Sequence, residues 1–327
     1  MKFSARKIRW LLEYLVFRSI VCVVDAVPAQ TAARAAGTAA RFLCRVLPPK
    51  VLRFPVAREN LRRAYGPELT DAQADRIIVR MWIHLFRMVV EIVQLPRKLR
   101  LYNGLGVVQY HNSPASVRAL CCGRPAIVLS GHFGNWELAT AMFGFFGFPM
   151  GVVARDLDNP YLHRWFERWR TATGHRLISK KGGGGDMVQF LENRGALAML
   201  GDQDAGRRGI FVPFFGHEAS TFKSIALVAL QHRAVICMGY ARRLPDDFVN
   251  CRWVRFEMGC EDVIDTLDYE DSDDPVREIT IRYTAALERV IRKSPEQYFW
   301  IHRRWKSQPR QRVRKQPAAA VPVSRAA

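Results

Sequence analysis

The residues best suited to chemistry form one short segment, Ser-Gly-His-Phe-Gly-Asn-Trp-Glu at 130–137, which directly follows an apolar run predicted to be a strand. His132 stands where that strand ends. Asn135 is a suitable cap for a following helix, whose first turn would hold Glu137. A carboxylate that holds one imidazole nitrogen fixes the tautomer, so that the other nitrogen can take a proton from an alcohol. We therefore predict that His132 is a general base and that Glu137 orients it.

Charged residues also follow other predicted strands. Arg155 comes directly after one of them, where its cation could stabilise a developing oxyanion or hold a phosphate. Spacing alone is equally compatible with a surface arginine paired with Asp156 or Asp158. Asp202 and Asp204 leave another strand end, where they could orient Arg155 or bind acceptor hydroxyls. Two carboxylates without a third ligand nearby form a weak metal site, so we predict a polar role for them and no metal.

Two kinds of apolar pattern divide the chain. Up to about residue 122 the pattern is helical, and in its longest segment, 71–95, apolar residues fall on one face; Thr70 or Asp71 would cap this helix and Pro96 would end it. Further on, short apolar runs alternate with helical stretches, which predicts an α/β fold with a mostly parallel sheet flanked by helices. Ligands of such sheets bind beyond the carboxyl ends of the strands. The expected strands are 126–130, 150–154, 196–200 and 234–240, and a closing helix is expected over 275–293.

The charge and the amino terminus both indicate an acidic partner. Lys and Arg number 50 against 30 Asp and Glu, and a net charge of +20 suits nucleic acid or an anionic membrane surface. Residues 8–27 have about the length of a membrane span, but they include four charged side chains that are costly at bilayer depth. We expect a basic amphipathic or monotopic anchor. A single tilted span, a cleaved signal peptide and a soluble helix packed on the core are the alternatives.

Composition and two minor features exclude other classes. Hydrophobic residues make up 49% and charged residues 24%, which excludes a polytopic membrane protein and a disordered chain. The seven cysteines show no CxxC pair, so we expect reduced thiols rather than a disulfide framework. The run Gly182–Gly185 follows two lysines but lacks the Gly-Lys-Ser/Thr ending of a phosphate loop. We interpret it as a flexible loop whose lysines are candidates for contact with phosphate.

Four sequence blocks occur in order between about residues 10 and 306. The first is His-Phe-Gly-Asn-Trp-Glu at 132–137, and the second is Ala-Arg-Asp-Leu-Asp-Asn-Pro at 154–160. Gly-Asp-Gln-Asp at 201–204, followed by Phe-Val-Pro-Phe-Phe-Gly at 211–216, forms the third. The closing block is Pro-Glu-Gln-Tyr-Phe-Trp-Ile-His-Arg-Arg-Trp at 295–305. Together they resemble the lipid A biosynthesis late acyltransferase family, within the His-x4-Asp/Glu glycerolipid acyltransferases.

The resemblance implies a glycerol-3-phosphate acyltransferase-like fold and an O-acyltransferase that needs no metal, cofactor or covalent acyl-enzyme. It implies that His132 is the base and Glu137 its partner, and it favours a catalytic Arg155 over a surface one. The donor would be an acyl thioester of acyl carrier protein or coenzyme A. The acceptor would be a lipid A precursor or related glycolipid, among anionic lipids at the cytoplasmic face of the inner membrane. Substrate-binding roles are implied for Asn135, Asn159, Asp202, Asp204, Arg303 and Arg304.

The resemblance also implies a division of the chain into parts. Residues 1–27 would be the membrane anchor, 28–306 the acyltransferase domain, divided into a helical part to 122 and an α/β part from 123, and 307–327 a disordered basic tail. The same His–Glu chemistry would serve a lysophospholipid or another glycolipid as acceptor. The non-enzymatic alternative is a basic protein that binds anionic membrane or nucleic acid. No helix-turn-helix, zinc finger or RNP-like strand accompanies the charge, so we expect no nucleic acid, and no obligate protein partner is evident.

Overall fold

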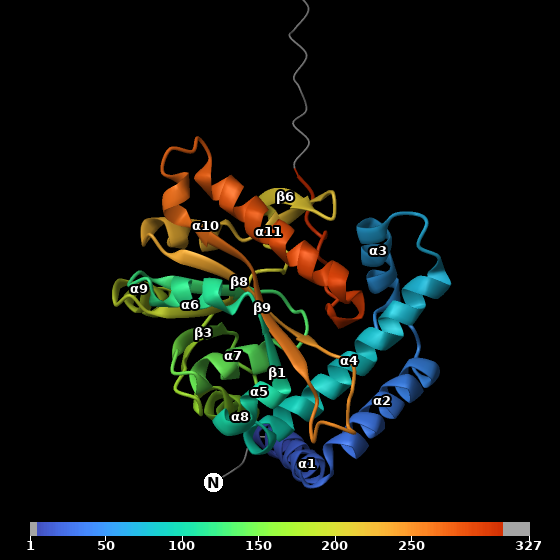
Figure 1. The fold of residues 1–327 in the computed structure, drawn as a ribbon. Helices are drawn as coiled ribbons and strands as arrows, with labels where there is room; N and C mark the ends of the chain where they lie inside the picture. The colour runs from blue at the N-terminus through green and yellow to red at the C-terminus, as the bar shows by residue number, and fades with distance from the viewer. Residues whose placement is uncertain (1–4, 310–327) are drawn as a thin grey trace, which may run out of the picture.

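The amino-terminal part of the chain forms a helical side of the molecule. The computed structural model describes residues 5–309. The amino-terminal part contains α1 (Ala5–Ala26), α2 (Ala29–Val46), α3 (Phe54–Tyr65) and α4 (Asp71–Lys98). Helices α1, α2 and α3 all pack against α4, as Figure 1 shows. The α2 face that is buried consists of alanines and one glycine, which allows a close approach of the two helix backbones.

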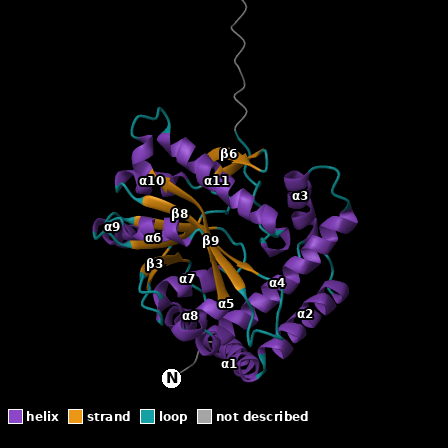
Figure 2. Ribbon diagram, in the orientation of Figure 1, coloured by secondary structure: helices purple, strands orange, loops and turns teal. Residues whose placement is uncertain are grey.

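The main sheet has seven strands. Figure 2 shows its strands packed among the helices. Its order is β1-β9-β8-β2-β5-β3-β4, and all neighbouring strands are parallel except β8 and β9. The four expected strands are all present, as β2, β3, β5 and β8, which confirms the mostly parallel α/β sheet. A separate antiparallel hairpin consists of β6 and β7. The strands are β1 (Val108–His111), β2 (Ala126–Ser130), β3 (Met150–Ala154), β4 (Arg176–Ser179), β5 (Ala196–Leu200), β6 (Ile210–Phe214), β7 (His217–Thr221), β8 (Val235–Arg243) and β9 (Phe256–Asp265).

Helices cover both faces of the sheet. Those of the α/β part are α6 (Ser113–Cys121), α7 (Trp136–Phe145), α8 (Pro160–Thr171), α9 (Gly184–Glu192), α10 (Lys223–Gln231) and α11 (Pro275–Lys293). Ile127 and Leu129 of β2 belong to the main core, which α9, α10 and α11 help to form. Val128, with the opposite orientation, belongs to a smaller cluster near α6 and α7. Short turns are α5 (Gly104–Val107), η1 (Leu101–Asn103), η2 (Gly206–Arg208), η3 (Thr266–Tyr269) and η4 (Pro295–Gln297).

The ends of α4 show where local sequence decides structure and where it does not. Thr70 caps the helix as expected: its hydroxyl accepts a hydrogen bond from the Gln73 backbone at 3.3 Å, and the Gln73 side chain accepts one from the Thr70 backbone at 2.8 Å. The predicted end at Pro96 is wrong by two residues, because α4 continues to Lys98. A proline in the last turn therefore does not stop this helix.

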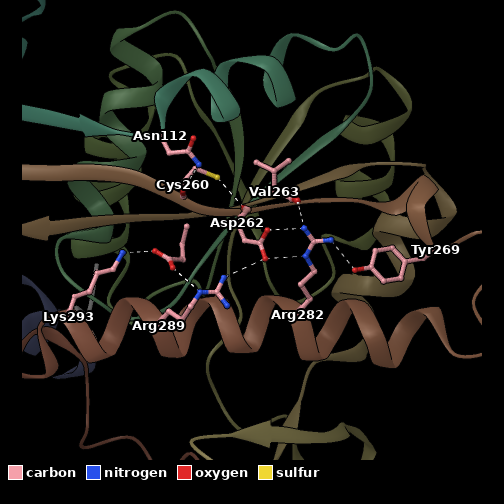
Figure 3. A network of polar contacts seen from close by, with 9 residues as sticks. Asn112, Cys260, Asp262, Val263, Tyr269, Arg282, Arg289 and Lys293 are labelled. Carbon is pink, nitrogen blue, oxygen red and sulfur yellow. Dashed lines mark hydrogen bonds and ion pairs between the residues drawn. The ribbon is translucent and has the colours of Figure 1, made fainter.

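Ion pairs fasten α11 along β9, as Figure 3 shows. Arg282 forms a fork with Asp262, with nitrogen–oxygen distances of 3.0 and 3.1 Å. Arg289 and Lys293 reach Glu261 at 2.9 and 2.6 Å. The opposite face of α11 is apolar and packs into the main core. Part of the positive charge of the chain is thus used inside the fold rather than presented to a partner.

The amino-terminal helix is peripheral. None of the helices within residues 5–309 is both long and apolar enough to cross a membrane. Tyr14 and Phe17 of α1 lie against aromatic side chains of α8. Ile8, Leu12 and Val16, on the other side of α1, are about half exposed or more. We predicted a disordered tail over 307–327, and residues 310–327 of it lie outside the described residues, as do residues 1–4. Ser307, at the start of the predicted tail, donates hydrogen bonds to the Asp204 carboxylate at 3.0 and 3.2 Å.

Candidate active site

The ends of two neighbouring strands bring His132 and Asp202 together. Strands β2 and β5 run parallel in register, with Ser130 opposite Leu200, so the residues that follow them leave the sheet side by side. The Asp202 carboxylate accepts two hydrogen bonds from His132: one from the backbone N–H and one from Nδ1, each at 2.8 Å. Because the carboxylate accepts from Nδ1, the proton lies there and Nε2 is left with a free lone pair. This is the arrangement of a general base and its orienting acid.

The electrostatics of the pair favour a charged imidazolium. Burial opposes the charge on His132, but the negative charge and hydrogen bond of Asp202 outweigh it, so the pKa of His132 is raised above its ordinary value. Burial likewise opposes the charge on Asp202, but the contacts with His132 outweigh it and lower the pKa of that carboxyl. The imidazole is thereby a stronger base than a free histidine.

Glu137 does not occupy the place that the sequence predicted. Both of its carboxylate oxygens accept hydrogen bonds from Arg170 of α8, at 2.6 Å from Nη2 and 3.0 Å from Nε. The hydrogen bond to the second nitrogen of His132, which we assigned to Glu137, is made by Asp202 instead. The reason is geometric, because Glu137 lies in the first turn of α7 and faces α8. Glu137 still contributes a nearby negative charge that raises the pKa of His132.

Aromatic rings hold the imidazole from two sides. The ring of Trp136 meets it edge-on with centroids 5.1 Å apart, and that of Phe299 is tilted at 5.9 Å. The Phe299 backbone N–H also donates to the His132 carbonyl at 3.0 Å. The closing sequence block is thus part of the site because it encloses the turn that bears His132.

Buried polar groups fix the same turn from behind. Gly134 has a φ of +59°, and a side chain there would lie 1.9 Å from the Ala241 carbonyl, so only glycine fits. Asn135 caps α7, as expected, through a 3.0 Å hydrogen bond from the Leu138 backbone, and its amide donates to Glu91 at 2.9 Å. Glu91 in turn forms an ion pair with Arg243, and both side chains are less than 10% exposed.

A cleft and an apolar cavity adjoin at the pair formed by Glu137 and Arg170. The cleft, of about 480 Å³, is lined by His132 and by Arg155, Lys180 and Phe222 among others. The cavity, of about 450 Å³, lies on the side of the sheet covered by α6 and α7. Glu137 and Arg170 line both spaces. The cavity walls are mostly apolar and include Val117, Leu120, Val128, Phe143, Phe146 and Val152.

Two of the residues predicted to bind substrate act within the protein instead. Asn159 is 6% exposed; its side chain caps α8 and donates to the Trp10 carbonyl at 2.9 Å, which ties α8 to α1. Asn135 is fully buried, and its two polar atoms already have protein partners. The geometry therefore corrects the prediction of direct substrate contact for both asparagines.

The charged candidates divide between buried and exposed positions. Arg304 is 2% exposed, donates to the Ser220 carbonyl at 2.5 Å and lowers the pKa of Asp202 through its charge, so it supports that carboxylate from inside the protein. The Asp204 carboxylate accepts hydrogen bonds from Ser307 at 3.0 and 3.2 Å and from the Gly206 backbone at 3.1 Å. Arg303 is exposed. The prediction of direct substrate contact for Arg304 is therefore corrected to a structural role, whereas substrate contact by Asp204 and Arg303 stays a prediction.

Arg155 lies in the cleft wall but is not fixed there. Its side chain is 81% exposed and lies 3.6 Å from the Asp158 carboxylate, which is the surface pairing that the spacing also allowed. Arg170 has the opposite properties, since its side chain is 19% exposed and doubly bonded to Glu137. Arg170 was not predicted from the sequence, because it lies inside a helix and belongs to no motif. Within residues 5–309, no cluster of three or more His, Cys, Asp or Glu residues suits a metal ion.

Comparisons with known proteins agree on one family. A family model described as bacterial lipid A biosynthesis acyltransferase matches residues 2–307. The lipid A biosynthesis lauroyltransferase of Escherichia coli K12 is 28% identical over 198 residues, which cover 59% of this chain and 60% of that protein. The phosphatidylinositol mannoside acyltransferase of Mycolicibacterium smegmatis is 26% identical over 224 residues, which cover 65% of this chain and 69% of that protein.

A third relative, the lipid A biosynthesis acyltransferase of Haemophilus influenzae, is 27% identical over 191 residues, or 57% of each chain. The aligned part of this chain thus spans about three fifths of the length of the lipid A relatives. The family model, in contrast, extends over almost all of the described residues. This match confirms the family that the four sequence blocks predicted: the chain belongs to the bacterial lipid A biosynthesis acyltransferase family.

Proposed function

We propose that this protein transfers a fatty acyl group from an acyl thioester to a hydroxyl of a lipid A precursor or a related glycolipid. The observation that carries the proposal is that His132, held by Asp202, lines a cleft that adjoins an apolar cavity. A base that lines a cleft and an adjoining space suited to a hydrocarbon chain meet two requirements of acyl transfer to an alcohol. The family and the names of its relatives support the same reaction class.

The reaction follows from the tautomer of His132. Its Nε2 takes the proton of the acceptor hydroxyl, and the oxygen attacks the thioester carbonyl to form a tetrahedral intermediate. The C–S bond then breaks, and the leaving thiolate takes the proton back from the imidazolium. Asp202 stabilises the imidazolium between these steps, since its charge raises the pKa of His132. The predicted oxyanion role of Arg155 stays a prediction, because its side chain lies at the cleft with most of its surface exposed.

The apolar cavity is the proposed place of the acyl chain. Its walls are contributed by strands β1, β2, β3, β5, β8 and β9 and by helices α6, α7 and α8. Each methylene that leaves water for such a space contributes about 0.8 kcal/mol to binding. The thioester carbonyl would lie where cavity and cleft meet, beside Trp136 and Glu137. The chain in the cavity would thus direct the carbonyl carbon toward His132.

Helix α1 is the proposed contact with the membrane. Ile8, Leu12, Val16 and Ile20 recur at four-residue intervals, and between 49 and 61% of each side chain is exposed. Basic residues accompany this apolar stripe at the start of the helix, where they would meet anionic headgroups. We place the protein at the cytoplasmic face of the inner membrane. A Leu12→Ser, Val16→Ser double variant should lose sedimentation with anionic vesicles yet keep its fold by circular dichroism; unchanged sedimentation would assign membrane contact to another surface.

Acyl carrier protein is the proposed donor. A chain with a net charge of +20 favours an acidic carrier over a small thioester, because association between opposite charges is accelerated. The rate with carrier-bound acyl chains should fall steeply as salt is added. Equal turnover with acyl coenzyme A at all salt concentrations would contradict the carrier protein and favour coenzyme A.

The acceptor is tested directly by mass analysis of product lipid. The purified protein is incubated with an acyl carrier protein thioester and an under-acylated lipid A precursor, with a phosphatidylinositol mannoside as second acceptor because one relative bears that name. A mass gain of one acyl chain that the His132→Ala variant lacks would establish the reaction. A gain only on the mannoside would move the acceptor to another glycolipid. A wild-type protein that acylates neither lipid would refute the proposed function.

A further inference from the structure

Lys180 is a cation of the cleft that the proposed mechanism does not use. It follows β4 directly, and its backbone N–H donates to the Ala154 carbonyl at 2.8 Å, which anchors its base at the edge of the sheet. Its Nζ lies 4.8 Å from the centre of the Phe222 ring. Lys180, Phe222 and His132 all line the same cleft. The lysine is therefore held at a defined place opposite the base.

The glycine run after the lysines gives this place its shape. Gly183 packs so closely on the end of β4 that a side chain there would lie 2.2 Å from the Ser179 carbonyl oxygen. The chain can therefore turn back at once after Lys180 and Lys181 and begin α9 at Gly184. We expected a loop before a helix here, and the structure has a turn that leads into α9. Lys180 lines the cleft, whereas Lys181 does not.

Lys180 differs from the other cations of the cleft in its surroundings. Both carboxylate oxygens of Glu137 neutralise Arg170, and Arg155 lies 3.6 Å from Asp158. In the part of the chain that the structure describes, Lys180 has no carboxylate within ion-pair distance. Its positive charge reaches His132, whose pKa it lowers against the larger opposing effect of Asp202. An ammonium group beside the base, without a protein anion, is available to an anion of the substrate.

We propose that Lys180, with Arg155 as its neighbour in the cleft wall, binds a phosphate group of a substrate beside His132. The inference rests on the proposed function, under which the donor carries a phosphopantetheine arm and the acceptor is a phosphorylated glycolipid. Both substrates offer the same chemistry, a phosphate oxygen that accepts hydrogen bonds from an ammonium group. A bound phosphate would also offset the charge of Lys180, so that binding of substrate makes His132 more basic.

The test compares phosphorylated ligands with their dephosphorylated twins by calorimetry, which needs no turnover. One pair is 4′-phosphopantetheine and pantetheine, and the other is a hexosamine 1-phosphate and the free hexosamine. Wild-type protein should bind the phosphorylated member of at least one pair about tenfold or more tightly, as a charge-assisted hydrogen bond implies. A preference within the first pair assigns the phosphate to the donor, and one within the second assigns it to the acceptor.

Variants of the two adjacent lysines separate a specific site from general attraction. Lys180→Met keeps an apolar stem over Phe222 and should abolish the preference for phosphate, whereas Lys180→Arg should restore most of it. Lys181→Met removes the same charge from the same turn but from outside the cleft, and should keep the preference. Equal binding of both members of each pair by the wild type, or an equal loss in the two Met variants, would overturn the proposal.

Failure of this inference is distinguishable from failure of the proposed function. If His132-dependent acyl transfer is observed but Lys180→Met leaves the KM of both substrates unchanged, the phosphate site is wrong and the function stands. If no acyl transfer is observed, the calorimetric comparison still decides whether Lys180 selects phosphate. Thermal unfolding of Lys180→Met should match that of the wild type, because the side chain is exposed and makes no ion pair within the described residues.

Discussion

The exchange of Asp202 for asparagine tests the revised pairing at the active site. The carboxylate accepts from both the backbone N–H and Nδ1 of His132 at 2.8 Å. An asparagine can accept from the backbone N–H with its carbonyl oxygen, but it then presents its NH2 group to Nδ1. Nδ1 must become the acceptor, so the proton moves to Nε2, which can no longer take one from the acceptor hydroxyl. The shape of the site is preserved while the tautomer is wrong.

The expected loss of kcat is large because the exchange removes the whole contribution of the general base. A positioned general base accelerates a reaction about 10²- to 10⁴-fold, so kcat of Asp202→Asn should fall by that factor. This corresponds to about 2.7 to 5.4 kcal/mol of barrier height. The KM values should change much less, because Asp202 is 4% exposed and buried behind the imidazole. The Asp204→Asn variant is the matched control, since Asp204 contacts Ser307 and Gly206 and should affect kcat far less.

The pH profile supplies an independent readout. The base must be neutral, so kcat/KM declines as pH falls through the pKa of His132, which Asp202 raises above its ordinary value. Without the negative charge that pKa drops, and the acid limb of the Asp202→Asn profile should move to lower pH even though its plateau is lower. Acyl transfer is followed by release of the free thiol. A plateau kcat within about threefold of the wild type, or an acid limb that does not move, would refute the assignment of Asp202.

Three further perturbations test the surroundings of the base. Arg170→Met leaves Glu137 buried without a cation and should lower the free energy of unfolding, measured by urea denaturation, by about 3 kcal/mol. The Glu137→Met, Arg170→Met double variant removes both charges and should recover most of that stability. Gly239→Val fills part of the apolar cavity. If the added side chain displaces two methylenes of the acyl chain, the preference for the longer of two acyl thioesters should fall about 15-fold. Gly239→Ala is the control and should not change this preference, because its Cβ meets only an ordinary contact at 3.5 Å. Arg243→Met should raise the pKa of Glu91 further above its value of about 6, because burial already raises it and the cation opposes that rise. Above pH 4.5, folding of the variant is then accompanied by proton uptake at Glu91. The free energy of unfolding, measured in urea across pH, should therefore fall more steeply with rising pH in the variant than in the wild type. Parallel stability curves for the two proteins would contradict this.

The fold was predictable where apolar residues are continuous. The strands β2, β3, β5 and β8 are buried on both faces, so their sequences are nearly uninterrupted apolar runs. β4 and β9 were not predicted because they are only partly buried: β4 lies at the edge of the sheet, and β9 alternates buried residues with charged ones that bind α11. β1 lies in the part expected to be helical and joins the opposite edge.

The sequence predicted that His132 belongs to the candidate site but not which residues contact it, for a reason that lies in parallel sheets. Sequence spacing favoured the carboxylate five residues after His132, since Glu137 belongs to the same motif. In space, the end of β2 lies beside the end of β5, because the two strands pair in register. His132 and Asp202, which are 70 positions apart in the sequence, are therefore in contact. Because Asp202 bonds to the imidazole, Glu137 does not. It holds Arg170 instead, at the boundary between cleft and cavity. The two carboxylates therefore have different roles. Asp202 fixes the tautomer of His132, and Glu137 holds the part of the cleft wall beside which we expect the acyl carbonyl to lie.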